Sequence, residues 1–181
     1  MVIDSICVFC GSSSGNKAIY IDAATSLGTE LAQHEIRLVY GGGKSGLMGC
    51  VADSVLNAGG KVTGIIPNYL KDRELGHQKL TNLEIVNSMH ERKQRMFDLA
   101  DGIVALPGGV GTLEEVLEII TWKQLGMHEK PIILLNSGGY WERLNDLILN
   151  TITHGFAASQ TKDLYKMISI PTEVIPTLRK F

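Results

Sequence analysis

Short apolar runs along the chain alternate with longer segments in which apolar residues recur at helical spacing. The runs of strand length cover residues 6–9, 37–40, 62–66, 83–86, 102–106, 132–135 and, in the tail, 167–170. The helical segments cover residues 18–34, 47–56, 89–100, 112–125, 141–153 and, in the tail, 172–178. Alternation of this kind is typical of parallel strands joined by crossover helices.

The predicted strands are apolar almost throughout, as in Ile132-Ile133-Leu134-Leu135. Strands of this type have helices covering both of their faces. We therefore predict an α/β fold, a single doubly wound parallel sheet (Rossmann-like) with helices on both faces. Residues 1–181 are expected to form one nucleotide-binding domain, since the chain shows no internal repeat, low-complexity tract or linker. The polar stretch 68–80 is expected to be a surface loop that carries a ligand contact.

Three of the predicted strands are followed directly by glycine-rich segments. These are Gly11-Ser12-Ser13-Ser14-Gly15, Gly41-Gly42-Gly43-Lys44-Ser45-Gly46 and Pro107-Gly108-Gly109-Val110-Gly111-Thr112. In an open parallel sheet, ligands bind beyond the carboxyl ends of the strands. The three segments can therefore converge on one site.

The segment from Gly108 to Thr112 has the features of a phosphate cradle. Glycine lets the backbone approach a ligand closely, and the start of the following helix offers unpaired N–H groups and a partial positive charge. The Thr112 hydroxyl would add a donor. The alternative is a tight strand-to-helix turn in which Thr112 is an ordinary N-cap.

The second glycine segment matches the dinucleotide pattern Gly41-x-Gly43-x-x-Gly46 only in part. The acidic residue that should end the next strand is missing, because that strand ends Ile-Ile-Pro-Asn. A phosphate loop of the nucleoside-triphosphatase type would need glycine where Leu38 stands. One or two anion-binding loops remain, and a monophosphate is the simplest ligand. We expect Ser12, Gly42 and Gly43 to join Gly108–Thr112 in binding it.

Two cations lie on the apolar face of the helix predicted at 89–100. At about 100° per residue, Arg92 and Lys93 fall inside the arc defined by Met89, Met96 and Ala100. A buried cation without a partner costs several kcal/mol. The functional interpretation is that both bind a substrate phosphate or sugar at the strand ends. The alternative is that they extend to solvent or form a structural salt bridge.

Glu115 has two competing interpretations. Thr112-Leu113-Glu114-Glu115 matches a capping box, which would account for the carboxylate completely. On the helical wheel, however, Glu115 falls between Ile119 and Trp122, one turn from the proposed phosphate loop. A partly desolvated carboxylate there could stabilise an oxocarbenium-like centre, act as a nucleophile or activate water.

Composition excludes several partners. The formal net charge is −2, which gives no bulk electrostatic reason to bind nucleic acid or an anionic membrane. No apolar run approaches the ~20 residues of a membrane helix, and the N-terminus does not resemble a secretory signal. The three cysteines are odd in number, so the cytoplasm is the expected compartment. Cys7-x-x-Cys10 is expected to pack in the core on opposite strand faces, and the five histidines lack metal-ligand spacing.

Taken together, these motifs resemble the LOG ("Lonely guy") family of cytokinin-activating phosphoribohydrolases, long labelled possible lysine decarboxylases. The resemblance covers nearly the whole chain. Its most specific parts are Pro107-Gly108-Gly109-Val110-Gly111-Thr112-Leu113-Glu114-Glu115 and Met89-His90-Glu91-Arg92-Lys93, supported by Tyr40–Gly43 and Gly46–Gly49. Only the old family label would favour Lys44 as a pyridoxal-phosphate lysine, so a decarboxylase is disfavoured.

The resemblance implies hydrolysis of the N-glycosidic bond of an adenosine 5′-monophosphate, often N6-substituted, to free base and ribose 5-phosphate. By motif position, Arg92 and Glu115 match the family's catalytic pair. Substrate contacts are implied for Glu74, Lys93, Gly109, Val110, Gly111, Thr112 and Thr121. The resemblance also implies a homodimer with the site near the subunit interface, and no metal or redox cofactor. The alternative is a non-catalytic nucleotide or cofactor carrier on the same fold, which would not need Arg92 and Glu115.

Overall fold

Seven parallel strands form one sheet in the order β4-β3-β2-β1-β5-β6-β7. The structure is a computed structural model that describes residues 2–71, 77 and 79–181. The strands are β1 (Ser5–Phe9), β2 (Arg37–Tyr40), β3 (Val62–Pro67), β4 (Asn82–Val86), β5 (Gly102–Ala105), β6 (Ile132–Leu135) and β7 (Lys166–Ile168). The prediction of a doubly wound parallel α/β sheet is confirmed.

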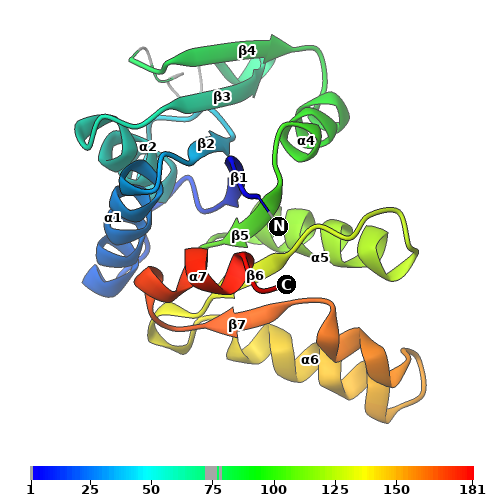
Figure 1. Ribbon diagram of the computed structural model, residues 1–181. Coiled ribbons are helices and arrows are strands. Elements are labelled where there is room, and N and C mark those ends of the chain that lie inside the picture. Colours follow the sequence, from blue (N-terminus) through cyan, green and yellow to red (C-terminus); the bar gives the residue numbers. More distant parts are fainter. Residues whose placement is uncertain (1, 72–76, 78) are drawn as a thin grey trace.

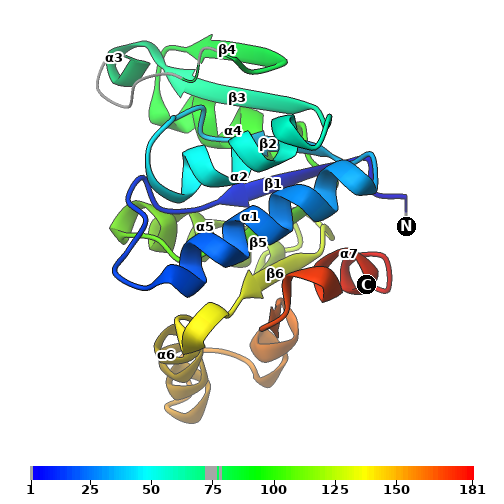
Figure 2. The same ribbon diagram turned by 90° about the vertical axis from the view of Figure 1, so that its left-hand side faces the viewer.

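Helices cover both faces of this sheet. They are α1 (Ala18–Gln33), α2 (Gly46–Asn57), α3 (Asn68–Lys71), α4 (Met89–Asp98), α5 (Val110–Gln124), α6 (Glu142–Thr153) and α7 (Val174–Leu178). Figure 1 shows α1, α2 and α7 on one face and α4, α5 and α6 on the other, and Figure 2 views the sheet from the side of α1 and α2. Because each face carries helices, the strands can be apolar on both sides.

Two separate apolar cores result, one on each side of the sheet. The first contains Leu27 and Leu31 of α1 and Val51 of α2, and the second contains Met96 of α4 and Val116 of α5. Consecutive strand residues alternate between the two. Cys7 accordingly lies in the second core and Cys10 in the first, and both are free thiols. The prediction that this Cys-x-x-Cys pair faces opposite sides is confirmed.

The central strand β1 pairs with β2 on one side and with β5 on the other. From β1 the chain winds outward through β2, β3 and β4, and then returns to start β5 on the opposite side of β1. The carboxyl ends of β1 and β5 therefore diverge at a topological switch point, where open α/β sheets bind their ligands. Gly11 and Gly108 lie at this point, and the Gly11 N–H donates to the Pro107 carbonyl over 3.0 Å.

The boundaries of several elements differ from those predicted. The helix expected from Thr112 begins at Val110, with Gly109 as its N-cap and no side-chain cap. Residues 68–71, expected to be loop, form the single turn α3 directly after Pro67. In the tail, β7 is Lys166–Ile168, and a 3₁₀ turn over Pro171–Glu173 precedes α7.

The segment Ser88-Met89-His90-Glu91 matches an S-x-x-E capping box in the sequence, and this cap forms at the start of α4. The Ser88 hydroxyl accepts a hydrogen bond from the Glu91 N–H over 3.1 Å, and the Glu91 carboxylate accepts one from the Asn87 N–H over 2.8 Å. Changing Ser88 to Ala is expected to lower the free energy of unfolding by about 1 kcal/mol. Urea denaturation would measure this loss, with Ser159→Ala in a 3₁₀ turn as the control. An unchanged urea concentration at the unfolding midpoint would show that the cap contributes nothing to the stability of the protein.

Candidate active site

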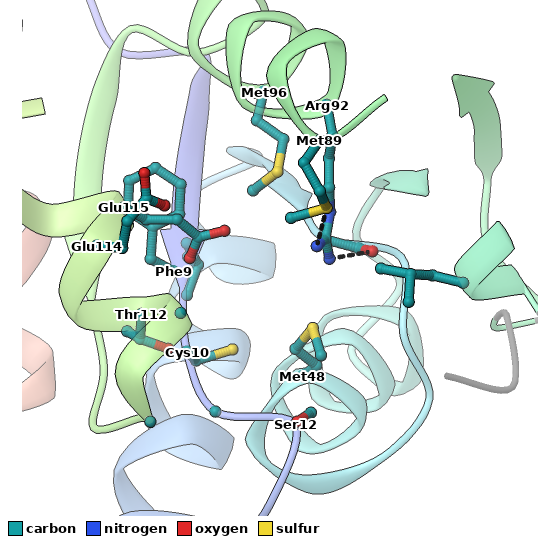
Figure 3. Close-up of a pocket in the computed structure, with 16 residues that line it drawn as sticks. Phe9, Cys10, Ser12, Met48, Met89, Arg92, Met96, Thr112, Glu114 and Glu115 are labelled. Carbon is teal, nitrogen blue, oxygen red and sulfur yellow. Dashed lines mark hydrogen bonds between the residues drawn. The ribbon is translucent and has the colours of Figure 1, made fainter. Parts of the chain in front are cut away.

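A pocket of about 220 Å³ opens at the carboxyl ends of β1 and β2, between α4 and α5. Figure 3 shows Met89, Arg92 and Met96 on its α4 side and Glu114 and Glu115 on its α5 side, with Cys10, Ser12 and Met48 along the floor. The lining residues are Val8, Phe9, Cys10, Gly11, Ser12, Gly41, Met48, Leu70, Met89, Arg92, Met96, Gly109, Gly111, Thr112, Glu114 and Glu115. Both residues expected to form the catalytic pair thus line one cavity.

Arg92 is held in the pocket wall by backbone carbonyls. Its side chain is 5% exposed. Its Nε–H donates to the Ile65 carbonyl over 3.1 Å, and its Nη2–H donates to the Gly41 carbonyl over 2.8 Å (dashed lines in Figure 3 mark hydrogen bonds). These bonds fix the plane of the guanidinium, because its donors form a rigid fork. Arg92 therefore presents a cation to the pocket without reorganising.

Glu115 projects from the second turn of α5 toward the same cavity. Since α5 starts at Val110 with Gly109 as N-cap, Thr112 stands inside the helix and cannot be the N-cap of a capping box. The capping-box interpretation of Thr112 and Glu115 was therefore wrong, because the N-cap is Gly109, three residues before Thr112. The Glu115 carboxylate is partly buried, where a charge interacts more strongly with its surroundings than in water.

The first turn of α5 supplies the features expected of a phosphate cradle. Gly109, Gly111 and Thr112 line the pocket, and Thr112 is buried. The first N–H groups of a helix have no carbonyl partner within it, and they point toward its N-terminal end. The exposed Val110 side chain lies outside the pocket lining among the described residues, so only its backbone could contribute.

Gly108 lies in a second, adjoining cavity of about 270 Å³. This cavity is lined by Gly11, Ser12, Ser13, Ser14, Gly15, Tyr20, Leu47, Pro107, Gly108, Gly109 and Tyr140. The Tyr140 hydroxyl donates to the Gly108 carbonyl. A Cβ on Gly108 would overlap the Thr112 side chain, so only glycine allows this close contact at the start of α5.

The backbone N–H groups that follow the loop from Gly41 to Gly46 are already hydrogen-bonded within the protein. The Leu47 and Met48 N–H groups at the start of α2 both donate to the Gly11 carbonyl, over 3.1 and 3.3 Å. Gly46 adopts φ +61° and packs directly against the backbone of Ser12. Because Gly11 already occupies these α2 donors, the described structure favours the α5 cradle over this loop for an anion.

Of the phosphate contacts expected from this region, Ser12 lines the pocket, whereas Gly42 and Gly43 do not. Ser12 lines both cavities. Gly42 packs against Ile66, and the Gly43 carbonyl accepts a hydrogen bond from the Tyr40 hydroxyl over 3.1 Å. Among the described residues that line the pocket, Gly41 represents this loop, and neither Gly42 nor Gly43 appears.

Two other expected substrate contacts, Lys93 and Thr121, do not line the described pocket. The Lys93 ammonium lies 2.5 Å from Glu114 Oε1 and 2.9 Å from Glu118 Oε2, which is the salt bridge that the sequence left as an alternative. Thr121 is exposed, and its hydroxyl donates to the Leu117 carbonyl one turn back. Glu74 lies outside the described residues.

The apolar wall of the pocket was not identified from the sequence. It consists of Phe9, Met48, Leu70, Met89 and Met96, which come from four different elements. Each looks like ordinary core in its own segment, so no local pattern marks it. The one available signal was position, because Phe9 ends β1 and Met89 begins α4.

The thiol of Cys10, which lines the pocket, is expected to be unreactive in the folded protein. Burial, and to a smaller extent the Glu115 carboxylate, raises the pKa of Cys10, and the same two causes raise the pKa of Cys7. Both thiols are therefore neutral at pH 8, and the thiolate is the reactive form. We expect iodoacetamide at pH 8 to modify the less buried Cys50 first and to reach Cys7 and Cys10 only in denaturant. Peptide mass spectrometry would check this, and rapid labelling of Cys10 in the folded protein would contradict it.

Neither a metal site nor a membrane span is found in the described part of the chain. No cluster of three or more His, Cys, Asp or Glu side chains there could hold a metal ion. No helix among the described residues combines the length and apolar character needed to cross a bilayer.

Comparison with known proteins gives consistent matches. The family model described as possible lysine decarboxylase matches residues 48–178. The chain is 46% identical to the cytokinin riboside 5′-monophosphate phosphoribohydrolase LOG1 of Arabidopsis thaliana, over 97% of this chain and 83% of the relative. It is 48% identical to the phosphoribohydrolase LOG of Oryza sativa subsp. japonica, over 92% of this chain and 68% of the relative.

Solved structures extend the fold similarity to more distant proteins. The molybdenum cofactor binding protein from Rippkaea orientalis has a TM-score of 0.74 at 20% identity, covering 99% of this chain and 98% of that chain. The molybdenum cofactor carrier protein from Chlamydomonas reinhardtii has a TM-score of 0.69 at 18% identity, covering 97% and 96%. At these identities the similarity shows the fold alone.

Proposed function

Because this chain belongs to the LOG family of phosphoribohydrolases, whose family model carries the description possible lysine decarboxylase, we propose that its pocket hydrolyses nucleoside 5′-monophosphates. The substrates are adenosine 5′-monophosphate (AMP) and its N6-substituted, cytokinin-type derivatives. Water cleaves the N-glycosidic bond, and the products are the free base and ribose 5-phosphate. The observation that carries the proposal is the convergence of Arg92, Glu115 and the first turn of α5 on one cavity.

The phosphate is assigned to the first turn of α5. Gly109, Gly111 and Thr112 line this end of the pocket, and helix N-termini favour anions through free N–H groups and the helix dipole. Holding the phosphate there would place the ribose within reach of the next turn of the helix, which carries Glu115. Binding energy from a remote phosphate can be used to orient the reacting carbon.

Glu115 is assigned to the anomeric carbon. When the bond from C1′ to the base nitrogen breaks, positive charge develops on the sugar, and a nearby carboxylate stabilises it. The carboxylate then either attacks C1′, forming a glycosyl-enzyme that water cleaves, or directs water onto C1′. In both routes the new C1′–O bond comes from water, and one of its protons ends on the released base.

Arg92 is assigned the role of a fixed cation. A guanidinium stays protonated at all working pH values, so it is unsuited to donating the proton that the base takes up. It can stabilise negative charge on the departing base or on the phosphate. Its two hydrogen bonds to backbone carbonyls keep it in place before substrate arrives. A charge that is already in position stabilises the transition state most effectively.

The apolar wall suits the base. Met48, Met89 and Met96 are flexible, polarisable side chains that can adapt to different shapes. An alkyl group on N6 of the adenine would meet such a surface at little cost, and so would an unsubstituted ring. We therefore expect the protein to accept both AMP and an N6-alkylated nucleotide.

A carrier function is the weaker candidate. It would explain the phosphate cradle and the fold, which the molybdenum cofactor proteins share. It would not explain a buried arginine and a carboxylate facing one cavity. The relatives with 46% and 48% identity are named as hydrolases.

We also propose a cytoplasmic homodimer with the pocket near the subunit interface. The side chains of Val110 and Leu117 on α5, beside the pocket, are 82% and 42% exposed. Apolar side chains grouped at a surface are commonly covered by a partner. Light scattering after size-exclusion chromatography would give the mass of the assembly.

The deciding experiment is a direct assay. The protein is incubated separately with AMP and with isopentenyladenosine 5′-monophosphate, and the free base and ribose 5-phosphate are quantified by liquid chromatography and mass spectrometry. We expect both products in equal amounts. Tight binding of AMP without release of base would favour the carrier function.

A further inference from the structure

Lys93 lies on the apolar side of α4 but does not end in solvent. Its side chain is 9% exposed, and its ammonium is held between two carboxylates of α5, Glu114 at 2.5 Å and Glu118 at 2.9 Å. The two acidic residues are four positions apart, so they lie on the same face of their helix. One lysine thus joins α4 to two successive turns of α5.

This connection is located next to the proposed catalytic pair. Lys93 directly follows Arg92, and Glu114 directly precedes Glu115. At the far end of the same two helices, the rings of Phe97 and Trp122 pack edge to face with centroids 5.4 Å apart. The lysine therefore holds the helices together at the pocket, and the aromatic pair holds them on the other side.

Electrostatics argue against Lys93 as a phosphate ligand. One ammonium between two carboxylates leaves a local net charge of about −1, which would repel a phosphate dianion. Burial by itself lowers the pKa of Lys93, but the hydrogen bond to Glu114 and the ion pair with Glu118 outweigh it, and the pKa lies above its ordinary value. The ammonium is therefore charged and committed to the two carboxylates.

We propose that Lys93 is a positioning residue, which sets the separation of Arg92 and Glu115 across the pocket by pairing with Glu114 and Glu118. This inference rests on the proposed hydrolysis. It replaces the substrate contact that the family resemblance implied for Lys93. Positioning of this kind matters because a displacement of about 1 Å can cost about 10²-fold in rate.

Three variants test the proposal in the full-length protein. Lys93→Met removes the charge and keeps much of the chain length, Lys93→Arg restores a cation, and Glu118→Gln weakens the pairing at a residue outside the described pocket lining. The matched control is Arg95→Gln, which breaks the ion pair of the same helix with Glu84 on β4. Wild-type protein is assayed first, because base release by wild type tests the hydrolysis separately.

With AMP as substrate, we expect kcat to fall about 10²-fold in Lys93→Met and about tenfold in Glu118→Gln. KM should change less than about threefold, and calorimetric binding of ribose 5-phosphate should be retained. Lys93→Arg should recover part of kcat. The double variant should be no worse than Lys93→Met, since both remove one interaction. A large loss of ribose 5-phosphate binding in Lys93→Met, with Glu118→Gln unaffected, would overturn the proposal and make Lys93 a phosphate ligand.

A measurement that needs no activity completes the test. Spin labels on cysteines introduced at the exposed Gln94 of α4 and Gln124 of α5, in a Cys50→Ser background, report the separation of the helices by double electron–electron resonance. We expect the distance distribution to broaden or shift in Lys93→Met and to be unchanged in Arg95→Gln. An unchanged distribution in Lys93→Met would overturn the positioning role, whether or not wild type hydrolyses AMP.

Discussion

Changing Glu115 to Gln is expected to abolish base release from AMP, with a loss in kcat of about 10³-fold or more. The amide keeps the shape of the carboxylate but carries no charge to stabilise the cationic sugar. It can neither attack C1′ nor accept a proton from water. The change leaves the proposed phosphate cradle at Gly109, Gly111 and Thr112 intact, so AMP should still bind.

Chromatographic assay of free adenine and calorimetry with AMP would measure the two effects separately. Glu129→Gln is a suitable control, because Glu129 is exposed and lies outside the described lining of the pocket. Full turnover by Glu115→Gln would reject the assigned role. Loss of AMP binding together with turnover would make Glu115 a binding group for the ribose.

Changing Arg92 to Ala is expected to lower turnover of AMP about 10²- to 10³-fold. The change removes the buried cation from the pocket wall and leaves the Gly41 and Ile65 carbonyls without their guanidinium donor. Each carbonyl left without a donor costs about 1–3 kcal/mol, so the melting temperature should fall as well. Arg92→Lys keeps the charge but lacks the planar fork that reaches both carbonyls.

Assays below the melting temperature of each variant separate the loss of activity from the loss of stability. Arg95→Ala, on the same helix but paired with Glu84 away from the pocket, is the control. If Arg92→Ala lost stability but kept its rate per folded molecule, Arg92 would serve only to hold the ends of β2 and β3 together.

Much of the fold could be predicted because its signals are local. Apolar strands such as Ile132–Leu135, and the glycine-rich segments that follow three of the strands, are enough to predict a doubly wound sheet from the sequence alone. The placing of functional residues at strand ends follows from that topology. The Ser88 cap at the start of α4 is equally local, and it forms as the pattern indicated.

The sequence left open the contacts between segments that lie far apart in the chain. The sequence left open whether Lys93 binds substrate or forms a salt bridge, and no local pattern identifies Glu114 and Glu118 of another helix as its partners. The loop at Gly41–Gly46 has the composition of an anion site. Its helix donors are nonetheless taken by the Gly11 carbonyl, which no pattern within the loop could reveal.

The sequence by itself determined the parallel α/β sheet, the glycine-rich strand ends and the family, because periodicity, turn chemistry and contiguous motifs are properties of short segments. The tertiary structure decided which groups share a cavity. It placed Arg92 and Glu115 on opposite sides of one pocket, assigned Lys93 to two carboxylates, and assembled the wall from Phe9, Met48 and Met96. Partners of this kind are selected by packing and charge neutralisation in the folded chain, and neither acts until distant segments meet.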